Sequence, residues 1–197
     1  MGIGGQPVTI VVDVANVMGS RPDGWWRDRA GAAVRLHADI ARLAASGRVI
    51  LPDEPGETGT ERAGAPGFVM VLEGAAKAAA ARLAPPGPNA PPGPEASPGP
   101  GEVRVVQAAG SGDDAVVAVV RRLPGRRVVV TADRGLRERC VAAGAEIRGP
   151  GWLLGLVASR AGNIAGHGVV FGPPGPFNRV APLPLAGRRA GAPERES

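Results

Sequence analysis

The chain has 197 residues and a formal net charge of +5, and its 31 glycines and 21 prolines make up about a quarter of it. Because 44% of the residues are hydrophobic, the composition excludes a wholly disordered chain and indicates one compact domain with appendages. With one cysteine, Cys140, and two histidines, the chain cannot form an intrachain disulfide, and a multi-Cys or His-rich metal centre is excluded.

Short strands alternate with helices along the sequence. In chain order, the apolar and amphipathic patterns predict strand 8–12, helix 30–46, strand 68–72, helix 75–83, strand 103–107, helix 113–123, strand 127–131, helix 134–143, a weaker strand 145–148 and helix 152–158. The four strong strands are Val-rich and apolar on both faces, as parallel strands covered by helices are. The alternation therefore predicts an α/β fold with a central parallel sheet flanked by helices.

Two segments do not fit this pattern. Residues 85–101 hold eight prolines and four glycines, and proline cannot donate a backbone hydrogen bond, so we expect a polyproline-like or disordered insertion. Residues 159–197 are rich in Pro, Gly and Arg and are expected to form a flexible tail, and 52–67 a shorter flexible loop. The compact domain is therefore expected at 6–158, interrupted by the insertion.

A carboxylate follows each strong strand: Asp13, Glu73, the pair Asp113 and Asp114, and Asp133. The carboxyl ends of parallel strands meet at one edge of the sheet, where ligands bind in open α/β folds. Carboxylates that converge without neutralising partners raise one another's pKa, and a divalent cation such as Mg²⁺ or Mn²⁺ relieves that cost. Such an ion can activate water and stabilise charge on a phosphoryl oxygen, so the pattern points to metal-dependent phosphodiester hydrolysis.

The alternative interpretation is that these acids cap helix N-termini, where Asp is a favoured residue. This alternative has less weight for Asp13, because Asp13 ends an apolar strand and no strong helix signal follows it. It has more weight for Glu73, whose position would let it cap the next helix.

Four segments carry a resemblance to a known family. They are VVDVANVMGSRPDGWWRDR, VMVLEG, GSGDDAVVAVV and VVVTADRGLRERC, with D-x-x-N after the first strand and T-x-D-R-x-L after the fourth as the most specific parts. In this order and spacing they resemble the PIN-like nucleases of the NYN group, close to the YacP-like branch common in bacteria. The resemblance covers roughly 8–158 without the insertion. It implies a three-layer α/β/α PIN-like domain and a Mg²⁺- or Mn²⁺-dependent ribonuclease.

The resemblance also implies residue roles. Three carboxylates would act as metal ligands and catalytic residues: Asp13, Asp113 and Asp133. Three further side chains would shape or support the site: Asn16, Glu73 and Asp114. Asp114 belongs to this second group because it is rotated by about 100° from its neighbour around the helix.

The residues expected to contact RNA lie close after the first strand and beside the acid that follows the fourth. They are Arg21, Trp26, Arg27, Arg134 and Arg137. Arginine contacts phosphate, and tryptophan can stack on an unpaired base. Two alternatives stay open: one of the two neighbouring tryptophans anchors its loop on the core, and Arg134 and Arg137 pair with nearby acids instead of RNA.

Two departures from the family pattern favour a second hypothesis. Val14 stands where many members have glycine, and Gly135 stands where NYN nucleases often carry a second acid. A catalytically weakened RNA-binding or adaptor module on the same fold is therefore the alternative to a ribonuclease. Hydrolysis of small nucleotides by the same acids is a third hypothesis.

The remaining expectations concern location and partners. No apolar run reaches the ~20 residues of a membrane span, and the stretch 8–18 lacks the basic segment of a signal peptide. We therefore expect a cytoplasmic protein that has no membrane partner. Cys140 lies in an apolar helical stretch and is interpreted as a core residue instead of a nucleophile. Neither a homo-oligomer nor an association with ribosomes can be derived from the sequence.

Overall fold

The computed structural model describes residues 7–47, 49, 65–83 and 97–161, with side chains up to 159, and the structural statements below concern these residues. The strands are β1 (Val8–Asp13), β2 (Gly67–Leu72), β3 (Val103–Gln107), β4 (Arg126–Val130) and β5 (Glu146–Arg148). The α-helices are α1 (Val14–Gly19), α2 (Arg29–Ala45), α3 (Ala80–Leu83), α4 (Gly112–Arg122), α5 (Arg134–Ala142) and α6 (Pro150–Ala161), and a 3₁₀ helix, η1, spans Gly74–Ala79.

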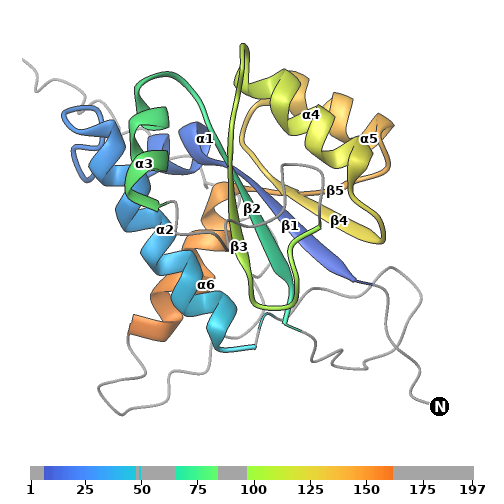
Figure 1. Cartoon of the computed structure of the whole chain (residues 1–197), viewed down its shortest axis with the longest axis horizontal. Coiled ribbons are helices and arrows are strands. Elements are labelled where there is room, and N and C mark those ends of the chain that lie inside the picture. Colours follow the sequence, from blue (N-terminus) through green and yellow to red (C-terminus); the bar gives the residue numbers. More distant parts are fainter. Residues whose placement is uncertain (1–6, 48, 50–64, 84–96, 162–197) are drawn as a thin grey trace, which may run out of the picture. The chain divides into compact units, whose positions relative to one another are not determined.

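The strands form one parallel sheet in the order β3-β2-β1-β4-β5, with β1 at its centre (Figure 1). In the register of the sheet, Asp13 at the end of β1 is aligned with Val71 of β2. On the other side of β1, Val12 is aligned with Val130 of β4. The predicted α/β class with a central parallel sheet is therefore confirmed.

Helices cover both faces of the sheet and enclose two cores (Figure 1). Because side chains alternate along a strand, Ile10 and Val12 of β1 pack on one face against α1, α2, η1 and α6. Val11 of β1 packs on the opposite face against α4 and α5, together with Val129 of β4. This α/β/α layering explains why the strands are apolar on both faces.

The chain connections place a switch point beside β1. The chain passes from β1 to β2 and β3 through α2, η1 and α3 on one face, and then crosses through α4 on the other face to β4. The connections that leave β1 and β4 therefore go to opposite faces of the sheet. In open α/β sheets, the crevice beyond such a strand pair is where ligands bind.

Three elements differ from the predictions. Helix α1 was not predicted, and the first part of the predicted helix 75–83 is 3₁₀, with Ala76 N donating to the carbonyl of Glu73 at 3.1 Å. Strand β3 was predicted to be buried on both faces, but it is an edge strand whose residues are partly exposed. β3 lies at the edge because the next strand, β4, does not pair with it. After β3 the chain crosses the sheet, and β4 pairs with β1 on the other side.

The end of the predicted insertion packs on the domain. Residues 84–96 lie outside the described part, but Pro98 is buried and Gly101 N donates to the carbonyl of Pro66 at 3.1 Å. The proline ring fits because Gly67 has no side chain, and a Cβ there would collide with Pro98. At the other boundary, α6 continues to Ala161, past the expected end of the domain at 158, and residues 162–197 are not described.

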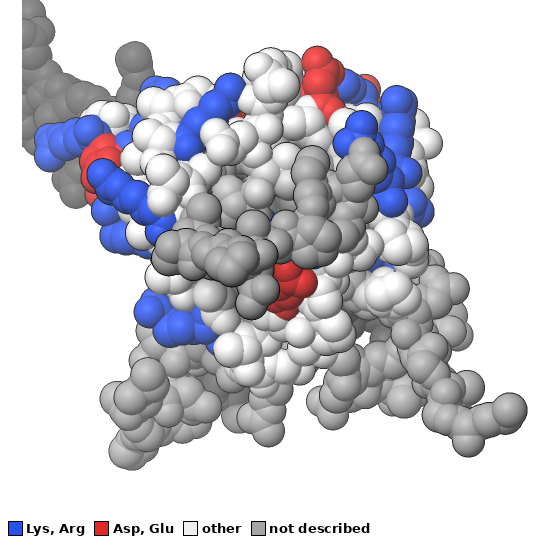
Figure 2. All heavy atoms as spheres, viewed as in Figure 1, with Lys and Arg blue, Asp and Glu red and all other residues white. Residues whose placement is uncertain are grey.

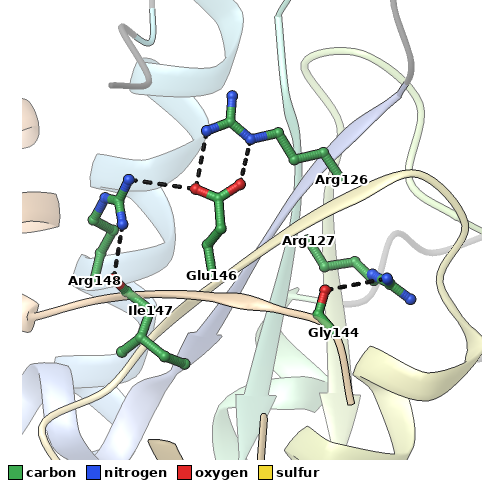
Figure 3. A network of polar contacts seen from close by, with 6 residues as sticks. All are labelled: Arg126, Arg127, Gly144, Glu146, Ile147 and Arg148. Carbon is green, nitrogen blue, oxygen red and sulfur yellow. Dashed lines mark hydrogen bonds and ion pairs between the residues drawn. The ribbon is translucent and has the colours of Figure 1, made fainter. Parts of the chain in front are cut away.

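An ion network ties the edge strand β5 to β4 (Figure 3). The carboxylate of Glu146 accepts hydrogen bonds from Arg126 at 2.5 and 2.9 Å and from Arg148 at 3.3 Å. The hydrogen bond from Arg126 holds the pKa of the Glu146 carboxyl below its usual value, although burial opposes this effect. In the same view, Arg127 donates to the carbonyl of Gly144 at 3.2 Å. The negative charge of Glu146 is therefore compensated within the protein.

Among the described residues, the structure contains no helix with the length and apolar character needed to cross a membrane.

Candidate functional site

Asp13 lies at the carboxyl end of the central strand, and its side chain is held by three donors. Its Oδ1 accepts a hydrogen bond from the backbone N of Asn16 at 3.2 Å, and its Oδ2 accepts from Nδ2 of the same residue at 2.7 Å. The hydroxyl of Thr131, directly after β4, also donates to Oδ2 at 2.8 Å. The carboxylate is 7% exposed and therefore has a fixed orientation at the edge of the sheet.

Asp13 is also the N-cap of α1, which corrects the expectation that no helix follows it. The sequence of α1 contains two β-branched valines and a terminal glycine in six residues, so its intrinsic helix propensity is low. The helix forms because Val14, Val17 and Met18 are buried in the core. Val14, the residue that differs from the family pattern, therefore packs in the core.

Thr131, the first residue of the T-x-D-R-x-L motif, supports the candidate site, although the sequence assigned it no role. It is fully buried, donates to Asp13, and its Oγ1 accepts the backbone N–H of Asp133 at 3.1 Å. This hydroxyl therefore links the ends of β1 and β4. The signal in the sequence was a hydroxyl residue at the end of an apolar strand, two positions before an acid.

Asp133 caps the helix that follows β4. Its Oδ1 accepts the backbone N–H of Leu136 at 2.7 Å, so the capping alternative applies to this acid as well. Among the described residues, Oδ2 of Asp133 accepts no hydrogen bond, and the residue is exposed. An acid in place of Gly135 would stand next to this carboxylate, since even a Cβ there would lie 3.5 Å from Oδ1.

Glu73 does not cap the helix that follows it, contrary to the capping alternative. Its Oε2 instead accepts the backbone N–H of Gly112, the first residue of α4, at 2.9 Å. The approach is so close that a Cβ at Gly112 would collide with the carboxylate. Glu73 therefore ties the end of β2 to the start of α4, where Asp113 lies.

Asp113 lies in the first turn of α4 and is partly buried. Burial raises the pKa of its carboxyl, and the negative charges of Asp133, Asp13 and, more weakly, Glu73 raise it further, against the positive charge of Arg139. Its carboxylate accepts no hydrogen bond from the residues that the structure describes. The tertiary structure therefore brings the acids after all four strong strands into one electrostatic neighbourhood.

Asp114 has a different environment from its neighbour. It is exposed and forms an ion pair with Arg139 of α5 at 2.5 Å. A solvent-exposed pair of this kind contributes about 0–1 kcal/mol to stability. Its negative charge is nevertheless compensated, whereas Asp113 forms no ion pair within the described part of the chain.

The donor chemistry of this edge fits a hard divalent cation. Asp13, Asp113 and Asp133 offer carboxylate oxygens, and the repulsion at Asp113 is the cost that a cation would relieve. Within residues 7–47, 49, 65–83 and 97–161, however, no three His, Cys, Asp or Glu side chains are placed to hold a metal ion together. Mg²⁺ is often bound by one or two carboxylates, with water and phosphate oxygens completing its shell.

Two of the arginines expected to contact RNA are engaged within the protein. Arg21 forms an ion pair with Asp39 at 3.1 Å, and both side chains are largely buried. Arg137 donates from Nε and Nη2 to the carbonyl of Thr131, at 3.2 and 3.1 Å. Arg137 therefore supports the end of β4 through a backbone carbonyl instead of pairing with an acid.

The other three expected RNA contacts are exposed. Arg134 is 94% exposed and forms a 3.4 Å ion pair with Glu138 on the same helix. Trp26 is 56% exposed and Arg27 is exposed, whereas Trp25 is partly buried against the first core. Of the two tryptophans, Trp25 is therefore the one that anchors the loop.

Cys140 lies in the core between α5 and the sheet and is fully buried. Burial raises the pKa of its thiol to about 11. The thiolate form is therefore rare at neutral pH, which agrees with a core role.

Comparison with known proteins shows a likeness at the level of the fold. No family model and no curated protein matches the chain. Among solved structures, the crystal structure of a mutant of Rae1 (YacP) from Bacillus subtilis is similar, with a TM-score of 0.50 and 13% sequence identity over 79% of this chain and 78% of that chain. The chain therefore has a YacP-like fold, as the motifs led us to expect.

Proposed function

We propose that the protein is a metal-dependent ribonuclease of the YacP-like branch of the NYN group, which hydrolyses RNA phosphodiester bonds in the cytoplasm. The observation that carries the proposal is that Asp13, Asp113 and Asp133 lie at or after the carboxyl ends of strands in one parallel sheet, with Asp13 joined to the end of β4 through Thr131. Burial and the charges of Asp133 and Asp13 raise the pKa of Asp113, which agrees with this placement. These acids lie at the switch point of the sheet. The motif resemblance and the likeness to Rae1 (YacP) support the same class of activity.

The three proposed metal ligands differ in how firmly the protein holds them. Asp13 is oriented by Asn16 and Thr131 and would provide a fixed ligand. Asp133 uses one oxygen as a helix cap and has the other available, and both oxygens of Asp113 are available. A Mg²⁺ or Mn²⁺ ion bound there would activate water and stabilise charge on the phosphate.

The sharpest test uses Asp113→Asn, because this substitution removes a charge without breaking a hydrogen bond to a described residue. Purified protein is incubated with labelled single-stranded RNA in Mn²⁺ or in EDTA. We expect cleavage by the native protein in Mn²⁺ alone, and a loss of about 100-fold or more in the variant.

The matched control is Glu102→Gln, at the amino end of β3. It also removes one negative charge, and its amide oxygen can still accept the hydrogen bond from Gly99 N at 2.8 Å, while the ion pair with Arg104 at 3.0 Å is lost. This control should cleave at the native rate. Equal cleavage by native protein and Asp113→Asn, or cleavage that persists in EDTA, would show a contaminating nuclease and refute the proposal.

The second hypothesis, an RNA-binding module without catalysis, is favoured by one observation. Within the described part of the chain, no three potential ligands are placed to hold a metal ion together. If native protein and Asp113→Asn bind RNA equally and neither cleaves it at any Mn²⁺ or Mg²⁺ concentration, this hypothesis replaces the ribonuclease.

A further inference from the structure

The loop between α1 and α2, residues 20–28, exposes an aromatic side chain. Trp26 is 56% exposed, and among the described residues Val141 on α5 is the only other large hydrophobic residue exposed to this degree. A single exposed apolar side chain is common on protein surfaces and is not by itself a site. The packing and the charges around Trp26 carry the inference.

Trp26 is presented on a rigid support. Its ring packs edge-to-face on Trp25, with ring centroids 6.3 Å apart and an angle of 86° between the planes. Trp25 packs against the first core and carries the guanidinium of Arg29 at 5.4 Å from its ring centroid. The backbone turns at Gly24, where φ is +77° and the carbonyl accepts the N–H of Arg27 at 3.0 Å. Little conformational freedom is therefore left for a ligand to remove.

The acids and the arginines around Trp26 are all exposed, but they differ in their contacts. The two acids of the loop, Asp23 and Asp28, each accept a hydrogen bond from a nearby backbone N–H, at 3.1 and 2.8 Å. Arg27 and Arg29 are exposed, and neither forms an ion pair with another described residue. Figure 2 shows Lys and Arg side chains over the α2 side of the face drawn, and again over the α4 and α5 side. The loop and the first residue of α2 thus offer an aromatic surface flanked by two exposed arginines that form no ion pair with a described residue.

We propose that this loop binds an unpaired base of single-stranded RNA, which stacks on Trp26 while Arg27 and Arg29 contact the flanking phosphates. Stacking on an aromatic side chain tolerates any base but requires that the base be unpaired. The inference rests on the proposed ribonuclease, because the six-residue α1, about 9 Å long, joins the loop to Asp13. The bond that is cleaved would lie a few nucleotides from the stacked base.

The binding test is done in EDTA, so that it does not depend on cleavage. The anisotropy of a labelled 12-nucleotide single-stranded RNA measures the Kd of the full-length protein and of Trp26→Ala, Trp26→Phe and Val141→Ala. We expect Trp26→Ala to raise the Kd about tenfold, Trp26→Phe to stay close to native and Val141→Ala to be unchanged. A blunt duplex of the same sequence should bind more weakly and equally to all variants.

Three results would overturn the proposal. They are an unchanged Kd for Trp26→Ala with native thermal melting, a duplex that binds as tightly as the single strand, and polyglutamate that competes as well as RNA of equal charge. The last result would identify an acidic peptide as the partner of the loop.

A cleavage test separates this inference from the proposed function. In Mn²⁺, Trp26→Ala should lower kcat/KM about tenfold on the 12-nucleotide RNA, whereas Val141→Ala should leave it unchanged. Asp113→Asn should abolish cleavage without raising the Kd measured in EDTA. If native protein does not cleave but Trp26→Ala still weakens binding, the ribonuclease proposal fails and the base-binding loop stands.

Discussion

The acids at the carboxyl edge of the sheet and Glu146 at the β4–β5 edge are carboxylates of one small domain in opposite environments. Glu146 accepts hydrogen bonds from Arg126 and Arg148, and its pKa is lowered. Asp113 accepts no hydrogen bond from a described residue, and burial and the charges of Asp133 and Asp13 raise its pKa against the opposing charge of Arg139. A compensated carboxylate stabilises the fold, whereas an uncompensated one lowers stability until a cation or proton binds. The comparison separates structural charge from charge available for function.

The same difference is found among the arginines. Arg126 and Arg148 share one carboxylate, and Arg21 pairs with Asp39. Arg27 and Arg29 form no ion pair with any described residue. In both signs of charge, the structure distinguishes residues that pair within the fold from residues whose charge remains available for a partner.

The largest effect on stability is expected when the compensated carboxylate of Glu146 is removed. Glu146→Ala should lower the free energy of unfolding by about 1–2 kcal/mol, since it leaves two partly buried guanidinium groups without their shared acceptor. Its cleavage rate per folded molecule should be native. Urea unfolding beside the cleavage assay measures both, and Asp113→Asn should show the reverse pattern. Loss of activity in folded Glu146→Ala would break the comparison.

The contact between Glu73 and Gly112 is expected to affect activity. Glu73→Gln keeps an acceptor oxygen for the N–H of Gly112, so cleavage should fall less than about threefold. Glu73→Ala removes the acceptor and should lower cleavage about tenfold or more, as expected for a group that positions a ligand. Gly112→Ala should have a similar effect, because its Cβ collides with the carboxylate. If Glu73→Gln loses as much activity as Glu73→Ala, the charge of Glu73 acts directly.

An effect on stability of the same size as that of Glu146→Ala is expected at Thr131, which holds Asp13. Thr131→Val removes the hydroxyl that donates at 2.8 Å to a buried carboxylate and should cost about 1–2 kcal/mol of unfolding free energy. Thr131→Ser keeps the hydroxyl and should stay within about 1 kcal/mol of native. Thermal unfolding of the two variants measures the difference, and equal melting temperatures would show that the hydrogen bond contributes nothing.

The smallest effect is expected in the pH dependence of stability. The contributions of Glu146 and Asp113 should change with pH in opposite directions. The folded-state pKa of Glu146 lies below its unfolded value of about 4.3, so its stabilisation is present above that pH and is lost as the pH falls through the lowered pKa. The folded-state pKa of Asp113 lies above its unfolded value of about 3.9. Its ionisation therefore lowers stability above the raised pKa, and this cost disappears as the pH falls toward 3.9.

Unfolding of native protein, Glu146→Gln and Asp113→Asn between pH 3 and 7 measures this pair. The deficit of Glu146→Gln should shrink as the pH falls. The gain of Asp113→Asn should also be largest at neutral pH and vanish in acid. A destabilised Asp113→Asn at pH 7 would contradict the raised pKa.

Much of the fold could be predicted because burial leaves a local signal. The strands 8–12 and 68–72 were predicted within one residue of their observed ends, since a strand covered on both faces needs a continuous apolar run. Helix α1 could not be predicted, because its stability comes from the burial of Val17 and Met18 instead of from its own propensity.

The amino-acid sequence alone determined that acids follow the strands. A parallel sheet then carries every such residue to the same edge. The sequence also determined the class of fold and the arginine-flanked tryptophan. Only the tertiary structure decided which of these groups are compensated. Asp114 meets Arg139, Arg137 meets a carbonyl and Glu73 meets the start of α4, while Asp113 meets other acids. Compensation depends on contacts between residues far apart in the chain, and spacing along the sequence does not encode them.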